Sequence, residues 1–129
     1  MENLFNVKNY TSEELIIAQP ETPITELYQT MQRERIRHIP IVKNGEGVGI
    51  VSDRDVKFVS YSTGVTEMTA EQIMTDRPYT VDMNCELKDI ISKMNDKKIN
   101  STLIKDDNGK IVGIFTSSDA LDLLAKHIL

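Results

Sequence analysis

The chain has 129 residues, of which 40% are hydrophobic and 27% charged, a composition typical of a globular domain rather than of a disordered or fibrous protein. Its net charge of −5 argues against a nucleic acid as the main partner, because affinity for that backbone comes from clustered lysines and arginines. The apolar runs are short, so we expect no membrane insertion, and the single cysteine favours a reducing, cytoplasmic setting.

Two stretches carry apolar residues at the i, i+3, i+4, i+7 spacing of an amphipathic helix. They are Ile24, Leu27, Tyr28 and Met31 in the first half, and Leu87, Ile90, Ile91 and Met94 in the second. Thr22, ahead of Pro23, is the expected N-cap of the first helix, and Asn84 or Cys85 that of the second. The pattern predicts two equivalent helices.

Each of these helices is followed by two short apolar runs with a polar turn between them, which predicts a β-hairpin. The runs are residues 39–42 and 48–51 in the first half, and 103–105 and 111–115 in the second. Asn44-Gly45 and Asn108-Gly109 supply residues that tight hairpin turns favour. Extended pieces at 15–18 and 79–81 are expected to add an edge strand in front of each helix.

Both hairpins end in the same motif: a glycine, two apolar residues, a hydroxyl residue, and an aspartate three positions beyond the hydroxyl. The motif runs from Gly49 to Asp55 and again from Gly113 to Asp119. A further helix is expected after each aspartate. Its apolar stripe continues to the C-terminus in the second copy, whereas residues 60–64 break the pattern in the first. Residues 64–78 form the connection, in which 69–74 could be a short helix.

These elements predict an α/β fold of the α+β type, built from two repeats at residues 1–64, with an N-terminal lead-in, and 65–129, with a linker. Each repeat has the order β-α-β-β-α and forms a small sheet with helices on one side. Packing the two sheets together about a pseudo-twofold would bury both remaining faces.

The element order, the strand from Arg37 to Val42 and the doubled motif resemble the tandem cystathionine β-synthase (CBS) domain pair, or Bateman module. The resemblance covers nearly the whole chain and implies a stand-alone CBS-domain protein that is not an enzyme. It further implies an adenosine-containing ligand (AMP, ADP, ATP or S-adenosylmethionine) in clefts between the repeats, an energy-sensing, regulatory role toward an unidentified partner protein, and a homodimer. No cofactor is required, and magnesium would arrive only with a triphosphate.

By the same resemblance, Asp55 and Asp119 would accept hydrogen bonds from ribose hydroxyls, and Ser52 and Thr116 would contact the ribose or the first phosphate. A hydrogen bond to a charged group is worth roughly 1.5 to 3 kcal/mol, so losing either aspartate should weaken binding markedly. The candidates for contact with the phosphate are the basic residues Arg37, His38 and Arg54. The candidates for the walls around the adenine are the strand residues Ile17, Ala18, Tyr79, Thr80 and Val81.

Several alternatives remain open. The two hydroxyl-x-x-Asp motifs have the spacing of a helix capping box, and capping and binding can coexist. The second copy has the neutral residues Asn100, Ser101 and Ser118 where the first has basic ones, which predicts unequal sites, with Lys97 or Lys98 as substitute cations. Residues 106–109 are better interpreted as a turn than as a metal site. The alternative function is a structural or oligomerising scaffold with empty clefts.

Overall fold

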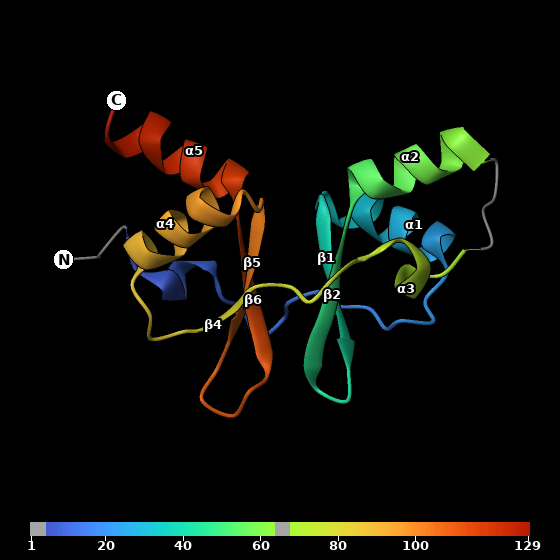
Figure 1. The fold of residues 1–129 in the computed structure, drawn as a ribbon, viewed down its shortest axis with the longest axis horizontal. Helices are drawn as coiled ribbons and strands as arrows, with labels where there is room; N and C mark the ends of the chain where they lie inside the picture. The colour runs from blue at the N-terminus through green and yellow to red at the C-terminus, as the bar shows by residue number, and fades with distance from the viewer. Residues whose placement is uncertain (1–4, 64–67) are drawn as a thin grey trace. The chain divides into compact units, whose positions relative to one another are not determined.

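The computed structural model describes residues 5–63 and 68–129, which form two compact units (Figure 1). The first-repeat unit is Ile16–Pro78, and the second-repeat unit joins the N-terminal segment up to Leu15 with Tyr79–Leu129. This division differs from the repeat boundaries at 1–64 and 65–129, because the segment before each repeat packs with the other repeat. Each unit has a mixed α/β fold with one three-stranded sheet.

The first-repeat unit has the sheet order β1-β2-β3, with antiparallel pairing throughout. Its elements are α1 (Ile24–Glu34), β1 (His38–Lys43), β2 (Glu46–Ser52), α2 (Asp53–Thr63), α3 (Ala70–Ile73) and β3 (Thr75–Asp76). The predicted hairpin is confirmed: Lys43 pairs with Glu46, and Asn44 and Gly45 form the turn with φ of 52° and 82°. The short helix expected in the connection is also present, as α3.

The second-repeat unit has the sheet order β4-β5-β6. Its elements are the 3₁₀ helix η1 (Val7–Tyr10), β4 (Thr80–Asp82), α4 (Leu87–Lys97), β5 (Ser101–Lys105), β6 (Ile111–Thr116) and α5 (Ser117–His127). β4 runs parallel to β5, and β5 pairs antiparallel with β6. Asp106 accepts hydrogen bonds from the backbone of Asn108 and Lys110 through its Oδ1 atom, which confirms that these residues form a turn.

The helices cover one face of the sheet within each unit (Figure 1). The predicted stripes are largely buried: α1 and α4 each turn three residues inward, whereas Tyr28 and Ile91 remain 40% and 37% exposed. The core of the first-repeat unit contains Ile24, Leu27, Met31, Ile39, Ile41, Val51, Val56 and Ala70. The core of the second contains Val7, Leu87, Ile90, Met94, Ile104, Val112, Phe115 and Leu123.

The predicted helix starts were wrong by one or two positions. Pro23 and Glu86 are the N-caps of α1 and α4, both with extended backbone and without a side-chain cap hydrogen bond. The hydroxyl of Thr22 instead accepts from the backbone N–H of Gln19 at 3.0 Å, because it belongs to the preceding turn. The break expected at residues 60–64 is also absent as far as Thr63, where α2 ends, and residue 64 lies outside the described residues.

A short segment from outside each repeat completes the sheet of each unit. We call residues 5–12 the N-terminal strap: Thr11 bridges antiparallel to Gly113, and the N–H of Ser12 donates to the carbonyl of Val112 at 2.7 Å. The ring of Tyr10 meets that of Phe115 edge-on, with centroids 4.8 Å apart. In the first-repeat unit, β3 pairs with β2 in the corresponding way. The strap was not predicted from the sequence.

No helix in the described part of the chain is long and apolar enough to cross a membrane.

Thr102 in β5 is fully buried, and its hydroxyl has no hydrogen-bond partner within residues 5–63 and 68–129. Valine has nearly the same shape without the hydroxyl. We therefore expect Thr102→Val to leave the free energy of unfolding unchanged or to raise it by up to about 1 kcal/mol. Thr102→Ser, which loses the methyl group, should lower it by roughly 1 kcal/mol. Urea unfolding measures both; a clear loss in Thr102→Val would show that the hydroxyl is satisfied in solution.

Candidate functional site

The repeated motif lies where the second hairpin strand passes into the following helix. Ser52 ends β2 and Asp53 begins α2, while Thr116 ends β6 and Ser117 begins α5. The helix therefore starts directly at the end of a strand that is buried in the sheet. This connection brings the hydroxyl and the aspartate of each motif to a helix N-terminus.

In both units the motif forms a reciprocal capping box. The N–H of Ser52 donates to Asp55 Oδ2 at 3.0 Å, and the N–H of Asp55 donates to Ser52 Oγ at 3.1 Å. In the second copy the N–H of Thr116 donates to Asp119 Oδ2 at 2.8 Å, and the N–H of Asp119 donates to Thr116 Oγ1 at 3.3 Å. The capping interpretation is confirmed.

Capping leaves part of each carboxylate available. Only the Oδ2 atoms of Asp55 and Asp119 take part in the boxes, and neither Oδ1 atom accepts a hydrogen bond from the described part of the chain. Both aspartates are half-buried. A carboxylate held by its own backbone in one orientation is a preorganised acceptor for a pair of ligand hydroxyls.

The start of the first hairpin strand lies beside the motif. The N–H of Asp53 donates to the carbonyl of Arg37 at 2.9 Å, and His38 pairs with Ser52 across the hairpin. The matching contacts in the second-repeat unit join Ser117 to Asn100, at 3.0 Å, and pair Ser101 with Thr116. Residues 37 and 38 therefore lie next to the first motif.

The edge segment begins at the same end of each sheet. Ala18 bridges parallel to Ile41, with its N–H donating to the carbonyl of Pro40 at 3.0 Å and its own carbonyl accepting from Val42 at 2.8 Å. The carbonyl of Tyr79 accepts from Leu103 at 2.8 Å in the corresponding way. One end of each sheet thus gathers the edge segment, the start of the first hairpin strand and the capping box.

The residues expected to form adenine walls differ in their exposure. The side chains of Ala18 and Val81 pack against the cores of their units. Ile17, by contrast, is 46% exposed and makes no hydrogen bond to the described residues, while Tyr79 and Thr80 are half-buried. Alternation along the edge segment explains the difference, because successive side chains point to opposite faces.

The ends of the two sheets at which the motifs lie differ in charge. In the first-repeat unit, Arg37 and Arg54 are exposed near the motif. In the second, the hydroxyl of Ser117 donates to Asn100 Oδ1 at 3.2 Å, so neutral groups occupy the matching position. The same unit nevertheless has a cation at the C-terminal end of α4, where the Nζ atom of Lys97 lies 5.4 Å from the centroid of the Tyr79 ring. Both residues are candidates from the sequence, but their contact was not predicted.

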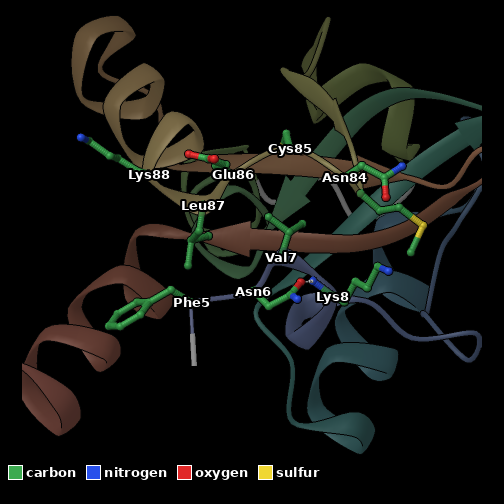
Figure 2. Close-up of a pocket in the computed structure, with 10 residues that line it drawn as sticks. Phe5, Asn6, Val7, Lys8, Asn84, Cys85, Glu86, Leu87 and Lys88 are labelled. Carbon is green, nitrogen blue, oxygen red and sulfur yellow. Dashed lines mark hydrogen bonds between the residues drawn. The ribbon is translucent and has the colours of Figure 1, made fainter. Parts of the chain in front are cut away.

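A separate hollow of about 450 Å³ lies in the second-repeat unit, between the N-terminal strap and the β4–α4 loop (Figure 2). The strap contributes residues 5–8, with the N–H of Lys8 donating to Asn6 Oδ1, the loop contributes residues 83–86, and the first turn of α4 contributes Leu87 and Lys88. α4 begins at this hollow and ends near the motif, so the hollow and the motif lie at opposite ends of α4. Burial, with smaller effects of Asp82 and Asp89, raises the pKa of the Cys85 thiol there, which favours its protonated form.

The described residues contain no group of three or more His, Cys, Asp or Glu side chains placed to hold a metal ion.

The family model for the CBS domain matches residues 7–61 and 70–126. The uncharacterized protein MK0525 of Methanopyrus kandleri is 33% identical over 113 residues, which make up 85% of this chain and 58% of that protein. The inosine-5′-monophosphate dehydrogenase of Thermoplasma acidophilum is 31% identical over 121 residues, which make up 89% of this chain but 24% of the enzyme. The chain therefore matches only part of each relative.

Solved structures of CBS domain proteins are also similar to this chain. The CBS domain pair of protein MJ0100, in complex with 5′-methylthioadenosine and S-adenosyl-L-methionine, has a TM-score of 0.80 and 28% identity, covering 95% of this chain and 98% of that chain. CBSX2 in complex with AMP has a TM-score of 0.74 and 19% identity, covering 95% and 97%, and shows the shared fold.

Proposed function

The chain belongs to the CBS domain family and contains two of its repeats, and from this premise we propose that it is a regulatory module that binds an adenosine-containing ligand and signals the ligand's level to a partner protein. The observation that carries the proposal is the pair of capping boxes. Each holds a half-buried aspartate at a helix N-terminus and leaves its Oδ1 atom unbonded within the described chain. The structure of the MJ0100 pair with two adenosine compounds supports this ligand class.

In the proposed complex, Asp55 and Asp119 accept hydrogen bonds from ribose hydroxyls through the Oδ1 atoms. The helix N-terminus that each aspartate caps favours a phosphate by its free N–H groups and its dipole. Ser52 and Thr116 line the path between sugar and phosphate. In the first-repeat unit Arg37, His38 and Arg54 would meet the phosphate, and a triphosphate would bring its own magnesium.

The adenine is proposed to lie along the free edge of each sheet. Ile17 offers an exposed side chain and backbone groups without a partner among the described residues, which suits contact with a base edge. Thr80 holds the comparable place in the second-repeat unit, because Ala18 pairs with Ile41 as Val81 pairs with Ile104, and Tyr79 would contribute from the start of the same edge segment. Ala18 and Val81 would contribute through the edge backbone rather than through their core-facing side chains.

The response to the ligand would come from a difference in affinity between two arrangements of the module, because a ligand can shift an equilibrium only by such a difference.

We also propose a homodimer that forms through α1, α2 and α5. Exposed apolar side chains on α1, α2 and α5 support it, and they include Tyr28, Phe58, Leu121 and Leu124. The module itself would catalyse no reaction, and the proposed setting is cytoplasmic.

A scaffold role is the second candidate, because the capping boxes alone explain why the motif has its residues. In that case the unbonded Oδ1 atoms would face only water.

A thermal-shift panel separates the two functions. With AMP, ADP, ATP or S-adenosylmethionine at about 100 times its Kd, binding to the native state adds roughly 2.7 kcal/mol of stability. We expect at least one of these ligands to raise the melting temperature by about 4 °C or more, and CMP, with a different base, to raise it less. No shift with any adenosine compound at millimolar concentration would favour the scaffold.

A further inference from the structure

The second-repeat unit lacks arginine near its motif, yet it holds a lysine at a defined place. Lys97 is the last residue of α4, and its Nζ atom lies 5.4 Å from the centroid of the Tyr79 ring. The ring belongs to the residue that begins the β4 edge segment. A cation over an aromatic face at an exposed site is stabilised by about 0.5 to 1 kcal/mol, enough to orient the ammonium group without trapping it.

Both partners lie at the motif end of the unit. The carbonyl of Tyr79 accepts from Leu103, so Tyr79 is next to the start of β5. Asn100, three residues after Lys97, accepts the N–H of Ser117, the first residue of α5. Thr116 and Asp119 cap that same helix. Lys97, at the end of α4, is therefore only three residues from a residue that contacts the N-terminus of α5.

The first-repeat unit has no equivalent of this cation. Its matching helix α1 ends with Glu34, which pairs with the neighbouring Arg33 at 3.4 Å. Both helices have 11 residues and end before a left-handed residue, Arg35 in one and Lys98 in the other, so Glu34 and Lys97 occupy equivalent positions. In the first-repeat unit the positive charge near the motif comes from Arg37, just before β1, and from Arg54 in α2. In the second-repeat unit it comes from Lys97, at the end of α4.

We propose that Lys97, held over the ring of Tyr79, makes the second-repeat unit select a phosphate-bearing nucleotide over the unphosphorylated nucleoside. The inference rests on the proposed adenosine-binding function, and it chooses Lys97 from the two substitute cations, Lys97 and Lys98, that the sequence offered. Lysine binds phosphate as a flexible point charge, and the weak contact with Tyr79 can be exchanged for a charge-assisted hydrogen bond. Tyr79 is then a positioning residue for Lys97.

The test compares the affinities for AMP and adenosine by isothermal titration at low ionic strength. An Asp55→Asn background reduces binding by the first-repeat motif. Lys97→Met is expected to weaken AMP binding by about tenfold and to change adenosine binding by less than about twofold. Lys93→Met, one turn earlier on α4, is the matched control and should change neither affinity.

Variants of Tyr79 provide a second readout, which is the ratio of the affinity for AMP to the affinity for adenosine. Because both ligands carry the same base, losing a contact between Tyr79 and the base would weaken both and leave this ratio unchanged. Tyr79→Phe keeps the ring and should keep the AMP preference, whereas Tyr79→Leu should reduce it. An unchanged ratio in Lys97→Met, or an equal fall in Lys93→Met, would overturn the role of Lys97 while leaving adenosine binding intact. Absence of binding by the wild-type protein would instead overturn the proposed function and this inference with it.

Discussion

Replacing Asp119 with asparagine is expected to weaken binding of the adenosine ligand by about tenfold or more, while the protein keeps most of its stability. Asparagine can still accept the N–H of Thr116 through its single carbonyl oxygen, so the capping box of α5 survives. Its NH₂ group, however, replaces the Oδ1 acceptor proposed to hold the ribose. A lost hydrogen bond to a charged group is worth roughly 1.5 to 3 kcal/mol. Asp55→Asn should behave in the same way.

Two further variants separate capping from binding. Asp119→Ala removes both, so it should lose the ligand and also about 1 kcal/mol of stability. Asp122→Asn lies on the same helix, in an exposed ion pair with Lys126, and should change neither affinity nor stability appreciably. Titration calorimetry and urea unfolding measure the two effects independently. Wild-type affinity in both Asp→Asn variants would remove the ribose role.

Replacing Gly113 with alanine is expected to cost about 3 kcal/mol of stability or more, at the upper end of the range for overpacking. A Cβ atom at this position would run into the backbone carbonyl of Tyr10 and would lie 3.1 Å from the Cα atom of Thr11. Backbone cannot move aside as a side chain can. The N-terminal strap would have to leave β6, which exposes Val7 and the ring of Tyr10.

Gly49 is the matched control, because it holds the equivalent place on β2. The atoms nearest to its added Cβ would be those of the Met74 side chain, a flexible neighbour that can shift. Gly49→Ala should therefore cost about 1 kcal/mol, clearly less than Gly113→Ala. Hydrogen exchange at the Ser12 amide, which donates to Val112, reports directly on strap release. Equal costs for the two variants would contradict the close backbone contact.

The elements that the sequence predicted are those whose residues repeat with a clear period. The apolar stripes of α1 and α4 and the asparagine-glycine turns depend on local chemistry, and local chemistry is visible in a sequence. The N-terminal strap was missed because its pairing depends on Gly113, a residue distant in the chain. The signal was nevertheless present: a glycine inside a strand often marks a close approach of another backbone, and Gly113 marks one.

In the candidate site, too, local features were predictable from the sequence and contacts between distant segments were not. The capping boxes were predictable from their spacing, and the neighbouring positions of Arg37 and His38 followed from the order of the elements. The separation of Ile17 from Ala18 depends on which face of the edge segment meets the core, and the segment is too short for its period to be read. The contact of Lys97 with Tyr79 joins a helix end to a strand start, and no local pattern encodes it.

The most direct test of adenosine binding through the two aspartates is titration calorimetry of the wild-type protein and of the Asp55→Asn/Asp119→Asn double variant, using the ligand that gives the largest thermal shift. We expect saturable binding by the wild-type protein and a loss of about 100-fold or more in the double variant, which should still unfold cooperatively near the wild-type temperature. No binding by the wild type, or equal affinity in the double variant, would contradict it.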